Sequence, residues 1–479
     1  MESSKIVQYI FNFPQKQQTK FLQFVQSPFY NQHQPTIQLL EYILSQIGKK
    51  KKKLEKEYVF KKLYPNKPYN EQRLFNLLSN LKKLLNRFQA AIYLEENPKM
   101  EALLCIETTY QNQQFDLMLN RAKQLEKNLE KKSDQDEHYY YLKYRLDYML
   151  GYQKGIYADR SNSAPLQKMM HQLDRYYILE KLRHSCHLVA NSMLMNTQYD
   201  WSLLDVIQNY IEQHQDLYRD DIAIWMYRTV LRSLRDSHNA EHYEKMKAYL
   251  HNQIDAFTVA EQEHLYLFSY NYCILQVNRG NTAYLEELFS LYQRGLTSKL
   301  IYNNGILSEW DYKNIATLGA KLKKFEWTEW FINNQRNKLA PTHRENVYQY
   351  SLAYLHYTKG KYREVLSNLL HVQYTDVQYH LSSSFLLLRT YYKMKDTEAL
   401  LSLIETFRIY VLRNKQMTTD KKKGYFNFLK LVKKLVLLKH DYHAYSKTEL
   451  KKKLEELHHQ IDKTDNIINR AWLVEELVA

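Results

Sequence analysis

The sequence predicts an all-α protein, with an N-terminal helical unit followed by an α-solenoid of antiparallel helical hairpins. The first observation is the scarcity of bend-forming residues, with 9 Gly and 8 Pro among 479 residues. Turns draw on the positive φ of glycine or the fixed φ of proline, so long helices with short links are expected. The second observation is apolar side chains at helical spacing along most of the chain. The third is an internal repeat of about 34 residues.

Composition also limits the function classes. The formal net charge of +16 favours acidic partners: nucleic acid, anionic lipid or an acidic protein surface. Cys105, Cys186 and Cys273 are far apart, which argues against a disulfide framework and a zinc ribbon. The start, MESSKIVQYIFNF, lacks a secretory pattern, and no apolar stretch approaches the ~20 residues that span a bilayer. We therefore expect a cytoplasmic protein.

Residues 1–98 are predicted to form the N-terminal helical unit. Apolar stripes predict helices before Pro14, before Ser27-Pro28 and after Pro35, and a shorter helix that ends at Leu63. Asn70 is a favourable N-cap for a long helix that carries a leucine stripe. That helix should end before Asn97-Pro98, because the residue before a proline resists the α conformation.

The long helix carries the sharpest functional candidate, a polar and basic stripe. Its residues follow steps of three and four and therefore share one face: Arg73, Asn76, Asn80, Lys83 and Arg87. Arg and Asn suit the edges of guanine and adenine, so a DNA contact is one interpretation. Lys51, within the run from Lys49 to Lys53, adds a candidate phosphate contact. The alternative is a solvated face of a basic protein.

The string EYVFKKLYPNKPYNEQRLFNLLSNLKKLL resembles, distantly, the start of winged-helix domains in some bacterial activators. Those proteins carry helical repeats downstream, and the resemblance implies a helix-turn-helix-like unit that binds DNA. The sequence departs from that pattern after Phe88, where more helix is expected and no β-wing is visible.

Residues 99–445 are predicted to form the array of hairpins. The pairs Leu318-Gly319, Leu352-Ala353 and Leu387-Leu388 recur at steps of 34 and 35 residues. With Gly360-Lys361-Tyr362 after the second pair, this pattern resembles the tetratricopeptide repeat, a pair of antiparallel helices. Leu388 and Lys395 stand where that family has a small residue and a glycine.

Other strings resemble a family of long, all-helical, functionally uncharacterised bacterial proteins: FLQFVQSPFYN, LYPNKPYNEQRLFNLLSNLKKLLNRF and the closing NRAWLVEEL. This resemblance spans the chain but implies no activity. Residues 446–479 are predicted to form a C-terminal capping helix, with Ser446 and Glu449 at capping-box spacing. Its apolar stripe, which runs from Leu450 to Ile468, also fits a short coiled-coil seam.

No sequence feature indicates an enzyme or a cofactor. The chain lacks GxxxxGK[ST], GxGxxG, GxSxG and HExxH. Glu-x-x-His pairs at Glu261, Glu455 and Glu456 and the string RHSCH, residues 183–187, supply too few ligands for a metal site. We expect no metal and no catalytic residues.

The preferred function is a non-enzymatic scaffold or adaptor that binds a protein or peptide partner through the helical repeats. Tyr350, Tyr354 and Tyr357, on the best-formed repeat, are its candidate partner-binding residues. The alternative is a DNA-binding transcriptional regulator with an N-terminal helix-turn-helix-like unit. A membrane-surface role for residues 425–438 is disfavoured. The sequence specifies neither the partner nor the oligomeric state.

Overall fold

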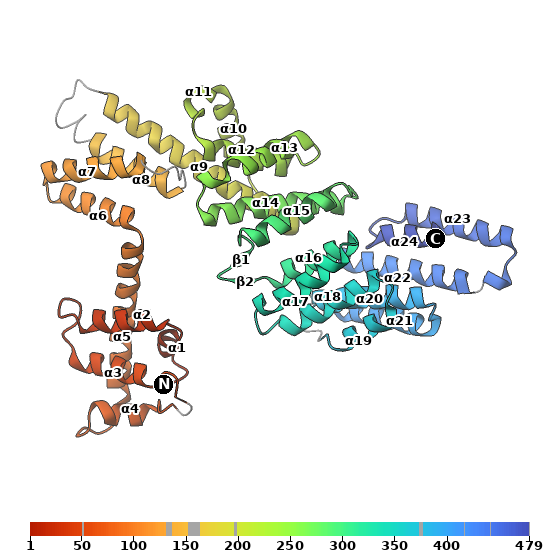
Figure 1. Ribbon diagram of the computed structural model, residues 1–479, viewed down its shortest axis with the longest axis horizontal. Helices are drawn as coiled ribbons and strands as arrows, with labels where there is room; N and C mark the ends of the chain where they lie inside the picture. The colour runs from red at the N-terminus through yellow and green to blue at the C-terminus, as the bar shows by residue number, and fades with distance from the viewer. Residues whose placement is uncertain are drawn as a thin grey trace. The chain divides into compact units, whose positions relative to one another are not determined.

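The computed structural model describes residues 1–49, 52–130, 137–151, 163–195, 199–372, 377–415, 417–440 and 442–478. These residues form 24 α-helices, three short 3₁₀ helices and one two-stranded hairpin (Figure 1). The prediction of an all-α fold is confirmed. None of the helices in the described ranges is long and apolar enough to cross a membrane.

Residue contacts divide the chain into two compact units. The first contains residues 1–181 and 216–224, and the second contains residues 182–215 and 225–479. The long helix α9 (Ala164–Met195) begins in the first unit and continues into the second.

The first unit starts with five helices around one apolar core. The helices are α1 (Lys5–Phe11), α2 (Gln15–Gln26), α3 (Gln34–Ser45), α4 (Lys56–Leu63) and α5 (Glu71–Glu96). Asn70 caps α5 as predicted, because its side chain accepts a hydrogen bond from the Arg73 backbone N–H at 2.8 Å. Phe88 of α5 lies at the centre of this core, with its ring close to those of Phe13, Phe21 and Phe24.

Beyond Asn97-Pro98 the same unit continues with a second, separate core. It is built by α6 (Pro98–Gln111), α7 (Phe115–Glu130) and α8 (Glu137–Gly151), and includes Leu103, Met118 and Leu146. The buried Asp221 accepts hydrogen bonds from Tyr140 and Arg175, so it ties α8 to α9 within this unit.

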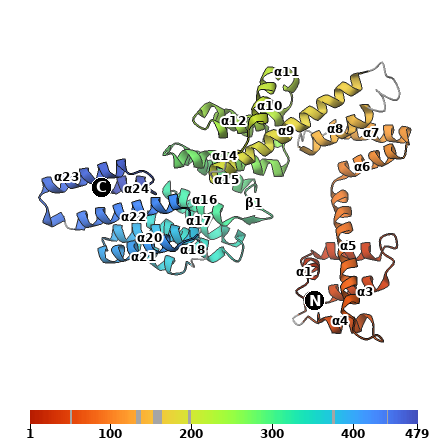
Figure 2. The same cartoon turned by 180° about the vertical axis from the view of Figure 1, so that it is seen from behind.

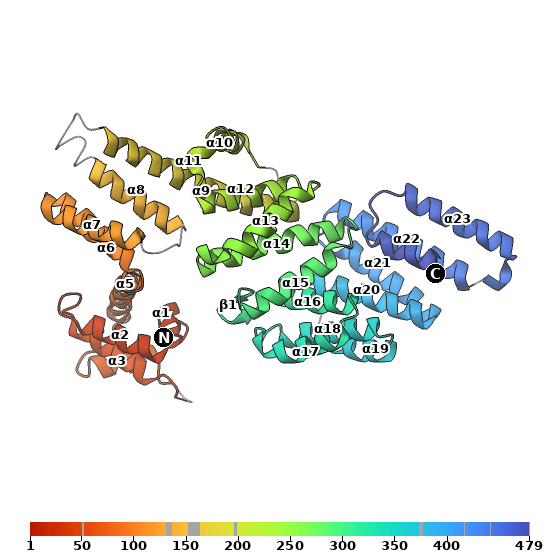
Figure 3. The same ribbon diagram turned by 45° about the horizontal axis from the view of Figure 1, so that its top comes forward.

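The second unit is a succession of helices that pack on their neighbours in the chain (Figures 1 and 3). After the second half of α9 it contains α10 (Ser202–Gln213), α12 (Ile222–Arg235), which begins in the first unit, α13 (Ala240–Gln253), α14 (Val259–Asn278), α15 (Tyr284–Thr297), α16 (Glu309–Lys321), α17 (Phe325–Gln335), α18 (Arg344–Thr358), α19 (Tyr362–Leu370), α20 (Val377–Met394), α21 (Thr397–Arg413), α22 (Thr419–His440), α23 (Lys447–Lys463) and α24 (Arg470–Val478). The short helix α11 (Gln215–Tyr218) stands at the boundary of the two units.

A small hairpin interrupts the helices and was not predicted. Strands β1 (Tyr302–Asn303) and β2 (Ile306–Leu307) pair in antiparallel fashion. Asn304 and Gly305 form the turn with φ of 50° and 78°, the left-handed values that a two-residue hairpin requires.

Five helix pairs are joined by the same turn. In each, a residue with positive φ follows the first helix, and the next backbone N–H donates to the carbonyl five residues earlier, as in a Schellman motif. The residues with positive φ are Gln113, Gly280, Lys323, Gly360 and Lys395. Lys395, which departs from the tetratricopeptide pattern in sequence, therefore has the same backbone conformation as Gly360.

The lysines in this turn lead to a stability prediction. A left-handed conformation costs a non-glycine residue about 1–2 kcal/mol, and the extra flexibility of glycine in the unfolded chain offsets part of that. Lys395→Gly and Lys323→Gly should each raise the free energy of unfolding by about 0.5–1 kcal/mol. Gly360→Ala should lower it by a similar amount. Urea unfolding measures both, and unchanged midpoints would contradict the turn assignment.

The C-terminal helices share one core with α20 and α21. Ser446 and Glu449 form the predicted capping box at the start of α23. The helix ends at Lys463, so Ile468 does not extend its apolar stripe; Ile468 instead packs on the shared core. Helix α24 follows and lies along α22 in both views (Figures 1 and 2).

Candidate functional site

The predicted partner-binding tyrosines lie in a layer made by α16, α18 and α20, which pack side by side. Helices α17, α19 and α21 each pack against a member of this layer. The side chains that concern us are called the α16–α18–α20 cluster. It consists of Trp310, Lys313, Tyr350, Tyr354, Tyr357 and Arg389.

Tyr350, Tyr354 and Tyr357 lie on one helix, and the charge of one arginine on the neighbouring helix α20 acts on all three. Burial raises the pKa of all three hydroxyls, that of Tyr357 to about 12, and the Arg389 guanidinium opposes this effect at each of them. Tyr350 is buried, whereas Tyr354 and Tyr357 are half-buried. The buried Nε of Arg389 has no hydrogen-bond acceptor among the described residues.

Lys313 marks the other end of the cluster. Its ammonium lies 5.1 Å from the Trp310 ring centroid and 5.4 Å from that of Tyr350, and it donates to Ser382 Oγ at 3.3 Å. Trp310 is 41% exposed. A cation held between aromatic rings beside an exposed tryptophan offers both charge and apolar surface to a ligand.

Helix α24 already occupies the adjoining part of α20. Its Trp472 lies on Tyr392, with ring centroids 5.3 Å apart, and 5.7 Å from the guanidinium of Arg389. The Glu476 carboxylate accepts from Lys393 Nζ at 2.7 Å, and the Glu476 carbonyl accepts from Lys439 Nζ. An aromatic ring and an acidic group of one helix thus bind the aromatic and cationic side chains of another.

No family model, curated protein or solved structure matches the chain.

The predicted nucleic-acid stripe lies on one flank of α5. Arg73, Asn76, Lys83 and Arg87 are exposed, and Asn80 is half-buried. The Arg73 guanidinium is 4.4 Å from the Tyr64 ring centroid. Lys51 lies outside the described residues. Seven residues separate α4 from α5, more than the three or four of a usual helix-turn-helix, and the described part of residues 1–98 has no strand.

Basic charge is concentrated in the same region. Residues 1–98 contain 16 Lys and Arg against 7 Asp and Glu, a formal net charge of +9 out of +16 for the chain. About a fifth of the sequence thus carries more than half of the excess positive charge, which is therefore not spread evenly along the chain.

The candidate metal ligands do not gather into a set large enough to hold a metal within the described ranges. No group of three or more His, Cys, Asp or Glu side chains that could hold a metal occurs within the described ranges. Cys186 is buried and donates to the Tyr227 carbonyl, and the Tyr227 hydroxyl donates to Glu261. The His187 and His264 rings meet edge to face, with centroids 4.8 Å apart.

The histidine pair makes stability depend on pH. Burial lowers the pKa of His187 to about 4, with smaller contributions from His264, Arg183 and His184. The unfolded chain, with a pKa near 6.5, binds the proton more readily, so stability should fall as pH drops from about 6.5 towards 4. The half-exposed ring limits the effect to about 1–2 kcal/mol. In urea titrations His187→Phe should flatten this slope, and His459→Phe on α23 should leave it unchanged.

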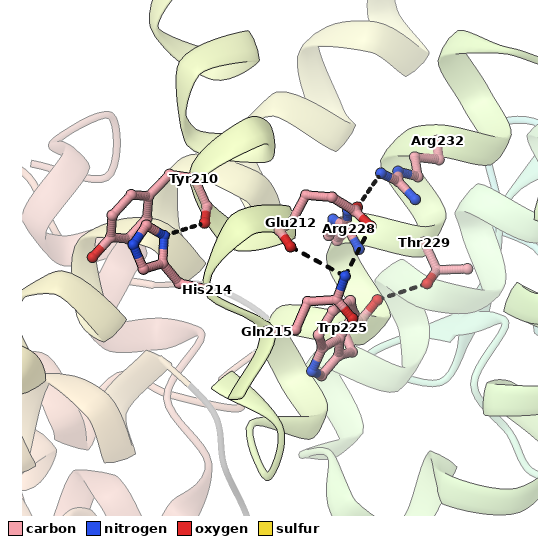
Figure 4. Close-up of polar contacts among 8 residues, drawn as sticks. All are labelled: Tyr210, Glu212, His214, Gln215, Trp225, Arg228, Thr229 and Arg232. Carbon is pink, nitrogen blue, oxygen red and sulfur yellow. Dashed lines mark hydrogen bonds and ion pairs between the residues drawn. The ribbon is translucent and has the colours of Figure 1, made fainter. Parts of the chain in front are cut away.

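A polar cluster between α10 and α12 was missed by sequence reasoning (Figure 4). The Glu212 carboxylate accepts from Gln215 Nε2 at 2.9 Å and from Arg232 at 2.8 Å, and it contacts the Arg228 guanidinium. The Arg228 side chain is 5% exposed and its guanidinium lies over the Trp225 ring. This cluster is a structural tie between two helices, because its charges are directed at one another.

Proposed function

We propose that the protein is a non-enzymatic adaptor whose repeats form an α-solenoid and whose α16–α18–α20 cluster binds a peptide segment of a partner protein. The observation that carries the proposal is the contact of α24 with α20. An aromatic and an acidic side chain there contact Arg389 and Lys393, and the charges of Arg389 and Glu476 both act on the Tyr357 hydroxyl. A partner segment with an aromatic and an acidic residue would find similar chemistry on the exposed part of the cluster.

Two further observations support this interpretation. The recurrent Schellman turns give successive hairpins one local geometry, which is typical of repeat proteins that bind extended partners. The three cysteines are free thiols, which fits the predicted cytoplasmic location.

Affinity purification of the tagged full chain from its native cells, with nuclease and high-salt washes, tests the proposal. The variant Trp310→Ala/Lys313→Gln should lose at least ~90% of the recovered protein partner, since tenfold weaker binding corresponds to about 1.4 kcal/mol. The matched control is Trp330→Ala/Lys321→Gln, whose tryptophan is 51% exposed on α17. Equal recovery with both variants would rule out the cluster as the binding site.

A second candidate function is nucleic-acid binding by residues 1–98, favoured by their net charge of +9 and by the exposed basic flank of α5. Binding of a random duplex should weaken steeply with salt. Arg73→Ala/Lys83→Ala/Arg87→Ala should reduce the slope of log affinity against log salt by about 3. Lys421→Ala/Lys423→Ala/Lys430→Ala on α22 makes the same charge change elsewhere. No binding at low salt would exclude this function.

A further inference from the structure

Helix α5 carries three parallel stripes, each with steps of three and four residues. The stripe from Leu74 to Phe88 is buried in the core of α1–α5. The basic stripe begins one residue earlier, at Arg73, and the third begins one residue later. The third stripe consists of Phe75, Leu78, Lys82, Leu85 and Gln89. Since each residue turns a helix by about 100°, the basic stripe and the third stripe lie on opposite flanks of the buried one.

The third stripe forms one wall of a groove of about 680 Å³, and α1 forms the other. Gln89 Nε2 donates to Tyr9 Oη at 3.3 Å and so connects the two helices at one end. From Phe75 to Gln89 the stripe extends for about 21 Å, the length of a helix of four turns.

The groove combines an apolar floor with a basic rim. Ile6 and Leu78 are half-buried, and Phe75 and Tyr9 are 63% and 53% exposed. Among the described residues that line it are Lys5, Lys56 and Lys82, and none is Asp or Glu. Lys56 is paired with Glu71 at 2.5 Å, whereas no ion pair of Lys5 or Lys82 is found within the described ranges.

We propose that this groove docks an acidic amphipathic helix of a partner protein. Apolar side chains at i, i+3 and i+7 of such a helix would lie on Ile6, Leu78 and Phe75, and its flanking carboxylates would reach Lys5 and Lys82. The groove shares no residue with the α16–α18–α20 cluster. A failure of peptide binding in the groove would therefore be distinguishable from a failure of the proposed function.

The chemistry favours a peptide over single-stranded nucleic acid. Exposed rings and lysines serve both ligands, but a half-buried floor that includes Ile6 and Leu78 gains from apolar side chains and gives phosphates no donor. The lysines of the basic rim can pair with carboxylates of a peptide. They are too few for the many phosphate contacts that nucleic acid needs.

The test uses a fluorescein-labelled 18-residue helical peptide with leucines at steps of three and four and glutamates on both sides of them. Anisotropy with the full-length protein should show saturable binding. A version with Lys in place of Glu, and one whose leucines are scattered, should each bind at least ~10-fold more weakly. A dT20 oligonucleotide serves as the competing ligand. Failure of the acidic peptide to bind, or equal binding of all three peptides, would refute the proposal.

Matched variants locate the binding. Phe75→Ala/Lys82→Glu should weaken the acidic peptide at least ~30-fold, and Lys82→Arg should retain its affinity. Lys61→Glu/Tyr93→Ala, on α4 and α5 but outside the groove, should change affinity less than ~2-fold; Lys61 is exposed and Tyr93 is 48% exposed. Equal loss in both double variants would overturn the proposal. So would dT20 binding that depends on Phe75 and Lys82, or a dimer in sedimentation that the groove variant abolishes.

Discussion

Glu212→Ala is expected to lower the free energy of unfolding of the second unit by about 2–3 kcal/mol. Removing one partner of a buried pair usually costs about 3–5 kcal/mol, because the remaining charge loses its compensation. Because the Glu212 side chain is half-exposed, the expected loss of stability lies just below that range. Burial lowers the pKa of Arg228 to about 10, and the nearby Arg232 adds to the effect. The site therefore disfavours a guanidinium that has no carboxylate beside it.

Arg228→Met, combined with Glu212→Ala, separates the energy of the Glu212–Arg228 interaction from the separate contributions of the two side chains. A methionine of similar length retains the apolar contact with Trp225 and removes the buried charge, so a loss of about 1 kcal/mol or less is expected. The double variant should then be more stable than Glu212→Ala alone. Guanidinium unfolding of all four proteins gives the coupling energy directly. Additive losses in the double variant would mean that Glu212 does not compensate Arg228.

Helix ends were the most predictable part of the fold. Asn70, Pro98 and the Ser446–Glu449 capping box act on backbone groups within one turn, so their effect is visible in the sequence. The Asn304-Gly305 hairpin carried an equally local signal. Its strands are only two residues long and lie between the helices α15 and α16, so they are too short to show an alternating apolar pattern.

The turns at Lys323 and Lys395 show the opposite case. Lysine disfavours positive φ, so the sequence gives no sign of the left-handed conformation at these two positions. The packing of the two flanking helices imposes that conformation. At position 360 the same turn is predictable from the sequence, because its residue is a glycine. These turns between helices are therefore more regular in backbone conformation than in residue type.

The candidate sites were only partly predictable, because they depend on contacts between helices. The spacing of Tyr350, Tyr354 and Tyr357 places them near one another on α18, but their common neighbour Arg389 comes from α20. The basic stripe of α5 was visible as a periodic pattern. The groove on the other flank was not, since α1 supplies its second wall.

Phe88→Ala should have the largest effect on stability, a loss of about 3–5 kcal/mol for the body formed by α1–α5. Phe88 is 2% exposed, and its ring centroid lies 5.0 Å from that of Phe21 and 5.6 Å from that of Phe24. Their shared core contains residues of the first 92 positions alone. Hydrogen exchange should therefore accelerate in α1–α5 and stay unchanged in α16–α22. Uniform acceleration along the chain would show that the body does not unfold independently.

Phe75→Ala makes the same chemical change 13 residues earlier on the same helix, where the ring is 63% exposed. It should alter stability by less than about 0.5 kcal/mol. Because the groove proposal predicts that this variant weakens the acidic peptide, the two phenylalanines separate folding from binding. A large stability loss in Phe75→Ala would assign its ring to the core, and any loss of peptide binding would then follow from unfolding rather than from a vacated contact.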